Sequence, residues 1–123
     1  MKDTTIKTLD DNEKNAVAAL MDLGQDRKTS HVIMFLLGNQ NATAKEIEMG
    51  TGLAQPEVSV GAMDLIESGW IKVSSINGAK GRPKRMYSIS ISKEEIIQAW
   101  KSVADSKCEA EKKKVEKLRS LLI

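Results

Sequence analysis

The chain has 123 residues, of which 41% are apolar and 29% charged, with a formal net charge of +2. This length suits one domain with one additional extended element. The single cysteine, Cys108, and the single histidine, His31, exclude an internal disulfide framework and a soft-ligand metal site within one subunit. No stretch approaches the ~20 apolar residues of a membrane span and no secretory signal opens the chain. We therefore expect a cytoplasmic protein without a metal, a cofactor or a membrane partner.

The first two predicted helices differ in how much apolar surface they carry. One runs through Leu23, is opened by an aspartate at position 10 or 11, and has apolar residues along one face. The next is opened by Asp26 or Thr29 and ends at Gly38. Because it is apolar nearly all round, we expect it to be the most buried helix. His31, near its start, is interpreted as a surface or capping residue.

The central stretch, Ala42–Trp70, predicts two short helices joined by a tight turn. Thr43 and Glu46 have the spacing of a capping box and open the first helix, which we expect to end before the glycine at position 50. Pro56 suits the first turn of the second helix, expected over 55–68. This order predicts a helix-turn-helix, whose second helix can enter the major groove of DNA. An ordinary helical hairpin is the alternative.

The chain then changes to a period of two, which indicates β-structure. Alternating residues over 70–76 and 86–91 flank the sequence NGAKGRPKR at 77–85, and this pattern predicts a β-hairpin. Residues 70–91 hold five basic and no acidic side chains, whereas residues 25–69 hold three basic and six acidic ones. A hairpin directly after a helix-turn-helix is the wing of a winged helix, and its basic tip can lie along DNA phosphates. A solvated basic loop is the alternative.

The remaining residues predict one long amphipathic helix. Ser92 and Glu95 form a second capping box, and no glycine or proline follows before the end of the sequence. A helix of about thirty residues is about 45 Å long, more than the small domain can cover, so we expect it to pair in a homodimer. A helix folded back on its own domain is the alternative. The residues expected at the dimer interface are Ile97, Trp100, Ala104, Cys108, Val115, Leu118 and Leu122.

Together these elements predict a mainly α fold with a small β-hairpin, of the α+β class. We expect a winged helix-turn-helix DNA-binding domain over 10–91 and a long C-terminal dimerisation helix over 92–123. The sequence TAKEIEMGTGLAQPEVSVGAMDLIESGWI, followed by GRPKRMYSI, resembles archaeal winged-helix transcriptional regulators near the MarR, ArsR and TrmB groups. This resemblance covers 26–91 and implies a homodimer that binds operator DNA, often as a repressor.

The sequence departs from the pattern of these regulators in the second helix of the motif. Val60 stands where they often carry arginine, and Asp64 stands at another frequently basic position. The helix has no lysine or arginine, which disfavours guanine readout. Gln55 is instead suited to adenine, Ser59 to a base or a phosphate, and Val60 to a thymine methyl group. No effector is implied.

Three places are expected to contact double-stranded DNA, namely the starts of both helices of the motif and the wing. The residues expected there are Thr43, Lys45, Gln55, Pro56, Glu57, Ser59, Val60, Lys80, Arg82, Lys84 and Arg85. The alternative function is a winged-helix protein-interaction module of the transcription machinery, which the acidic second helix favours and the basic wing disfavours. An enzyme is not expected, because the sequence offers no paired nucleophile and base, no phosphate loop and no cluster of metal ligands.

Overall fold

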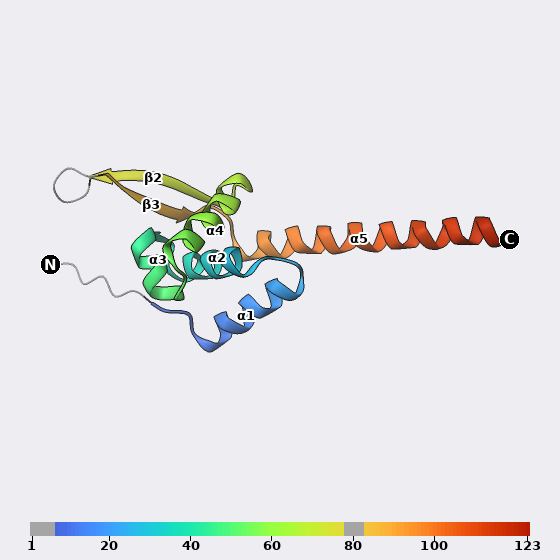
Figure 1. Cartoon of the computed structure of the whole chain (residues 1–123), viewed down its shortest axis with the longest axis horizontal. Helices are drawn as coiled ribbons and strands as arrows, with labels where there is room; N and C mark the ends of the chain where they lie inside the picture. Colours follow the sequence, from blue (N-terminus) through green and yellow to red (C-terminus); the bar gives the residue numbers. More distant parts are fainter. Residues whose placement is uncertain (1–6, 78–82) are drawn as a thin grey trace. The chain divides into compact units, whose positions relative to one another are not determined.

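The computed structural model describes residues 7–77 and 83–123 (Figure 1). The chain divides into two compact units, residues 1–91 and residues 92–123. The elements of the first unit are α1 (Asp11–Asp22), α2 (Arg27–Asn39), β1 (Asn41–Thr43), α3 (Ala44–Thr51), α4 (Gln55–Glu67), β2 (Ile71–Asn77) and β3 (Pro83–Ile89). The second unit is the single helix α5 (Lys93–Leu122).

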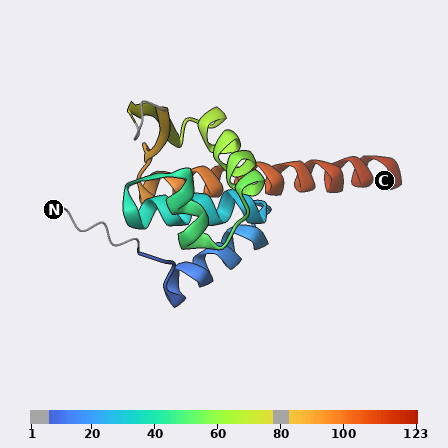
Figure 2. The ribbon, with the colours of Figure 1, turned by 60° about the vertical axis from the view of Figure 1, so that its left-hand side comes forward.

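The core of the first unit is built around α2, as its apolar sequence predicts. Figure 2 shows α2 between α1 and α4, and α2 also packs against α3 and the sheet. The apolar side chains of α2 with no exposed surface are Val32, Ile33, Phe35 and Leu36. Asp26 opens the helix, because its carboxylate accepts the Thr29 N–H at 3.0 Å. Burial of several large apolar side chains at one helix stabilises this unit more than any exposed ion pair does.

The helix ends of the motif follow the predicted caps, with one correction. Thr43 and Glu46 form the capping box of α3, and Gly52 ends that helix with a φ of 79°. Gly50, in contrast, lies inside α3 and is buried, so the prediction that it ends the helix is wrong. An ideal Cβ at Gly50 would lie 2.0 Å from Cε1 of Phe35. This glycine is therefore needed for close packing against α2 and not for a turn.

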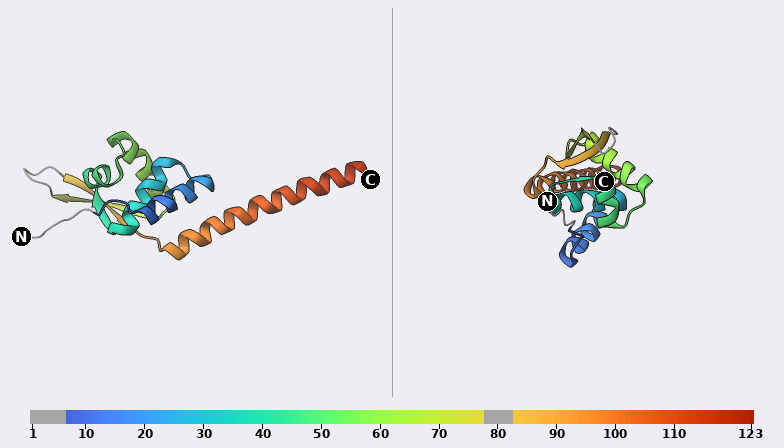
Figure 3. Two further views of the ribbon diagram at one scale, coloured as in Figure 1. Left: turned by 90° about the horizontal axis from the view of Figure 1, so that it is seen from below. Right: turned by 90° about the vertical axis from the view of Figure 1, so that its left-hand side faces the viewer.

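The sheet has three antiparallel strands in the order β1-β3-β2, where the sequence predicted only a two-stranded hairpin. The short strand β1 pairs with β3 through Asn41–Ser88, Ala42–Tyr87 and Thr43–Met86. β2 and β3 pair from Ile71–Ile89 out to Asn77–Pro83. The strand pairing therefore continues into the segment expected as a loop, so that Lys84 and Arg85 belong to β3. Figure 3 shows β2 and β3 reaching beyond the helices of their unit.

The second unit is one uninterrupted helix of 30 residues. The Ser92 hydroxyl accepts the Glu95 N–H at 3.1 Å, and Glu95 accepts the Ser92 N–H at 2.9 Å, which confirms the predicted capping box. At 1.5 Å per residue the helix is about 45 Å long. Within this helix, all of which the structure describes, only Ile96 is buried. Among the described residues, no helix is both long and apolar enough to cross a membrane.

Candidate nucleic-acid interface

The turn between α3 and α4 fixes how the start of α4 is presented. Leu53 is buried in the core of the first unit and holds the three-residue turn in place. Ala54 precedes α4 and offers no side-chain cap, but its own backbone N–H donates to the Glu57 carboxylate at 2.9 Å. Pro56 occupies the first turn, where its missing N–H costs nothing. The first two residues of α4, Gln55 and Pro56, are open to solvent.

One long edge of α4 is exposed and carries no charge over its first two turns. Of the residues predicted to contact DNA, Gln55, Ser59 and Val60 lie there, and Val60 is 48% exposed. Met63, which the sequence analysis did not include, is 56% exposed and follows Ser59 and Val60 by one helical turn. The opposite side of α4 is buried, as the apolar periodicity predicts. The spacing of Val60 and Met63 is the sequence signal by which Met63 could have been found.

Two acidic residues of α4 are bonded to α2. Glu57 forms an ion pair with Arg27, and the Thr29 hydroxyl donates to Asp64 Oδ2 at 3.1 Å. The Ala54 N–H, together with the positive charges of Arg27 and Lys28, holds the pKa of the Glu57 carboxyl below its ordinary value. Glu57 is therefore ionised at neutral pH and its charge is directed at α2. From the sequence, Glu57 was expected to contact DNA and the acidic character of this helix favoured a protein partner, but the sequence could not show that Glu57 and Asp64 have partners on α2.

The described cations of the wing lie on both faces of the hairpin. Lys84 pairs across the strands with Ile76, and Arg85 pairs with Ser75. Successive strand residues point to opposite faces, so Lys84 shares its face with Lys72, and Arg85 shares its face with the buried Tyr87. Lys84 and Arg85 are both exposed. The predicted contacts Lys80 and Arg82 lie outside the described residues.

The start of α3 contributes one cation and one cap. Lys45 is exposed on the first turn of α3. Thr43 is half-buried, and its hydroxyl accepts the Glu46 N–H at 3.3 Å. The Thr43 hydroxyl therefore has a structural partner already, whereas the Lys45 ammonium group is available to a ligand.

The residues expected at a dimer interface lie along α5, and most of them are exposed. They fall on one seam at intervals of three, four or seven residues, and Lys101 and Glu111 interrupt it. The apolar residues of this seam that are more than half exposed are Ile97, Val115, Leu118 and Leu122. Ala104 and Cys108 are also exposed, whereas Trp100 is half-buried. The helix thus carries an exposed apolar seam along its own length.

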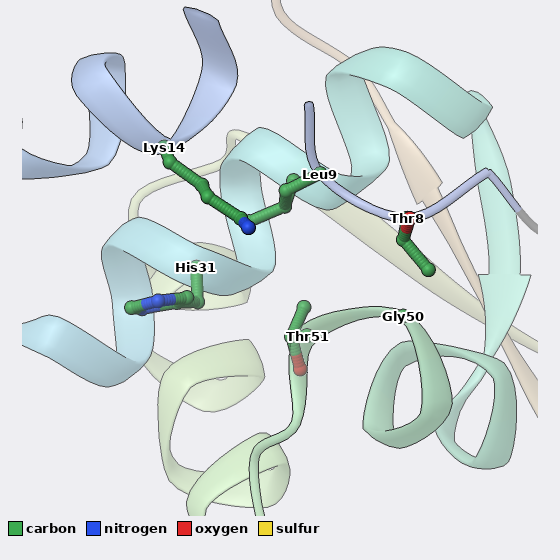
Figure 4. Close-up of a pocket in the computed structure, with 6 residues that line it drawn as sticks. All are labelled: Thr8, Leu9, Lys14, His31, Gly50 and Thr51. Carbon is green, nitrogen blue, oxygen red and sulfur yellow. The ribbon is translucent and has the colours of Figure 1, made fainter. Parts of the chain in front are cut away.

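A separate cavity of about 310 Å³ lies among α1, α2, the end of α3 and the residues that precede α1 (Figure 4). Its lining residues are Thr8, Leu9, Lys14, His31, Gly50 and Thr51. His31 is half-buried, and its Nδ1 lies 2.7 Å from the carbonyl oxygen of Arg27, so it is bonded within the first turns of α2. None of the lining residues was predicted to contact DNA. Among the described residues, no three histidine, cysteine, aspartate or glutamate side chains are grouped as metal ligands are.

Comparison with known proteins shows similarity in structure and none in sequence families. No family model and no curated protein matches the sequence. A possible transcriptional regulator from Methanosarcina mazei matches with a TM-score of 0.66 and 15% identity, over 92% of this chain and 98% of that chain. A transcriptional regulator homologue from Pyrococcus horikoshii matches with a TM-score of 0.51 and 17% identity, over 80% and 96% of the two chains.

A third solved structure is that of TrmBL2, described as an archaeal chromatin protein with a novel mode of DNA binding. It matches with a TM-score of 0.58 and 18% identity, over 89% of this chain and 42% of that chain. At these identities the likeness shows the fold alone. This chain has the winged helix-turn-helix fold, with an antiparallel wing sheet and a long C-terminal helix, and its structural neighbours are winged-helix transcriptional regulators.

Proposed function

We propose that this protein is a sequence-specific DNA-binding transcriptional regulator that acts as a homodimer and represses. In this proposal α4 enters the major groove and the wing lies along the phosphate backbone. One observation carries it, namely that the uncharged exposed edge of α4 and a basic wing occur on one small unit. The likeness of the fold to transcriptional regulators and to a DNA-binding chromatin protein supports it.

The proposal is tested by the binding of the purified protein to its own promoter DNA at two salt concentrations. We expect preferential binding to this duplex over a scrambled duplex of equal length, and weaker binding to both as salt rises. Binding that is equally tight on both duplexes would contradict sequence specificity. The absence of binding to either would contradict the function itself.

Base recognition is proposed to depend on Gln55 at the start of α4. Its side chain is exposed, and a glutamine amide can bind adenine in the major groove through two hydrogen bonds. Gln55→Ala is therefore expected to weaken binding to the preferred site by about 1–3 kcal/mol and to leave binding to random DNA nearly unchanged. Fluorescence anisotropy with both duplexes measures this difference. Gln98→Ala, which removes an exposed glutamine of α5, is the matched control, and an equal loss on both duplexes would show that Gln55 only supports the fold.

The wing is proposed to supply most of the electrostatic affinity, because residues 70–91 carry five basic and no acidic side chains. Removal of one phosphate-binding cation reduces the slope of log K against log salt by roughly 0.9, so Lys84→Ala with Arg85→Ala should reduce it by roughly 0.9 when one face of the hairpin meets DNA and by roughly 1.8 when both faces do. The control removes the same charge from α5 through Lys113→Ala with Lys117→Ala. A slope equal to that of the unaltered protein would show that these wing residues do not bind phosphate. The two single variants then show which face of the hairpin meets DNA.

Dimerisation is proposed through the apolar seam of α5. Exposed apolar residues at heptad-like spacing on a long helix are buried most simply against another such helix. Two copies would also present two copies of α4, which suits an operator made of two half-sites. Lys101 and Glu111 weaken the seam, so the pairing of α5 alone is expected to be modest.

A second candidate function is a protein-interaction module of the transcription machinery. It is favoured by exposed apolar side chains on α3 and α4, namely Met49, Val60 and Met63. Methionine-rich surfaces adapt to varied protein partners. This function predicts that Val60→Asp abolishes capture of a protein partner, while the two-salt DNA experiment shows no binding.

A further inference from the structure

The first turn of α2 is attached to α4 at three points. Arg27 forms an ion pair with Glu57, and the Thr29 hydroxyl bonds Asp64 at 3.1 Å. Between these two bonds the helices approach very closely, because an ideal Cβ at Gly61 would lie 3.0 Å from the carbonyl carbon and oxygen of Lys28. The backbone at Lys28 is thus packed directly against the middle of α4. The start of α2 therefore holds a fixed position beside α4.

The two cations at this position are partly open to solvent. The side chain of Arg27 is 51% exposed and that of Lys28 is 35% exposed. The Glu57 carboxylate engages Nη2 of Arg27, and a guanidinium group has five N–H donors in a planar fork, so donors remain for a second anion. Lys28 Nζ lies 3.8 Å from Asp26 Oδ2, which is too long for a strong hydrogen bond. Both side chains therefore retain unused donors beside α4.

We infer that Arg27 and Lys28 bind phosphates of the DNA strand that flanks the groove entered by α4, and that Glu57 positions Arg27 without contacting a base. This inference rests on the function proposed above and adds a DNA-binding surface that neither the wing nor the sequence pattern of α4 includes. Arginine forms directed hydrogen bonds with phosphate, and an adjacent carboxylate fixes its orientation. Lysine supplies a point charge of longer reach. Phosphate binding by α2 would set the register of α4 on the duplex.

The experiment measures the salt dependence of binding to a random duplex for single variants of the full chain. Arg27→Ala and Lys28→Ala are each expected to reduce the slope of log K against log salt by roughly 0.9. When the salt concentration rises fourfold, the loss of affinity in each variant is then roughly threefold smaller than the loss in the unaltered protein. Arg27→Lys keeps the charge and is expected to keep most of the slope. Lys14→Ala, a charge-matched change on α1, is expected to leave the slope unaltered. Circular dichroism and thermal melting establish that each variant is folded.

Glu57→Gln tests the positioning role. Glutamine can still accept the Ala54 N–H, so the start of α4 is kept while the ion pair is removed. We expect its affinity to change by the same factor for every duplex in a set with single base-pair changes. A changed preference at one base pair would show that Glu57 reads a base and would overturn this part of the inference.

The outcomes separate this inference from the function on which it rests. If the unaltered protein binds DNA and the wing variants reduce the slope, but Arg27→Ala and Lys28→Ala do not, only the inference is overturned. If the unaltered protein binds no duplex DNA at either salt concentration, both are overturned. A reduced slope in both α2 variants, with an unaltered slope in Lys14→Ala, supports the phosphate-binding surface on α2.

Discussion

Truncation after Ala104 is expected to convert the protein to a monomer and to weaken its binding to a two-half-site duplex by roughly 100-fold or more. The truncation removes the exposed apolar seam residues Val115, Leu118 and Leu122, so that two copies no longer share their proposed interface. Two linked binding units gain a factor of roughly 10²–10⁴ over one unit, because the second binding event is intramolecular. Light scattering measures the mass of the particle, and anisotropy with one-half-site and two-half-site duplexes measures the affinity loss.

A matched pair of substitutions in the full chain tests the same seam without truncation. Leu118→Asp places a charge in the seam, whereas Lys113→Asp places one on the opposite side of α5, about 140° away at 100° per residue. Leu118→Asp is expected to dissociate the dimer and Lys113→Asp to leave it intact. If the truncated chain still scatters as a dimer, the interface lies outside the second half of α5.

Phe35→Ala is expected to lower the free energy of unfolding by about 3–5 kcal/mol, the largest loss of stability that we expect from one substitution. The Phe35 side chain has no exposed surface and packs against Gly50 of α3. Removal of the phenyl ring leaves a cavity between α2 and α3, the first helix of the helix-turn-helix motif. Urea denaturation followed by circular dichroism measures the change in free energy.

Gly50→Ala is expected to lower the free energy of unfolding of the unaltered chain. In a chain that also carries Phe35→Ala, it is expected to raise it. In the unaltered chain its new Cβ would lie 2.0 Å from the Phe35 ring, and overpacking of this kind costs about 1–3 kcal/mol. With Phe35→Ala the space is free, and alanine is then favoured over glycine inside a helix by about 1 kcal/mol. Gly52→Ala is the control, because its φ of 79° disfavours alanine in both backgrounds. Additive effects of Phe35→Ala and Gly50→Ala would contradict the close packing of these two residues.

Signals among neighbouring residues were sufficient to predict most of the elements. The capping pairs Thr43–Glu46 and Ser92–Glu95 and the position of Pro56 depend on bonds within one helical turn, and the structure has α3, α4 and α5 starting where these residues indicate. The alternation on either side of the basic segment predicted the hairpin for the same reason. The winged helix-turn-helix fold could thus be inferred from the order of its parts.

Contacts between residues that are distant in sequence could not be predicted from the sequence, and only the tertiary structure shows them. The strand β1 has only three residues and no periodicity of its own; it forms because β3 offers a free edge to pair with. The sequence predicts that Gly50 ends a helix, but in the structure the absence of a side chain at Gly50 makes room for the Phe35 ring. The acidic character of α4 favoured a protein partner in the sequence, whereas the structure shows that Glu57 and Asp64 are bonded to Arg27 and Thr29 of α2. Each case depends on which side chain another element brings within a few ångströms, and the order of neighbouring residues does not specify that distance.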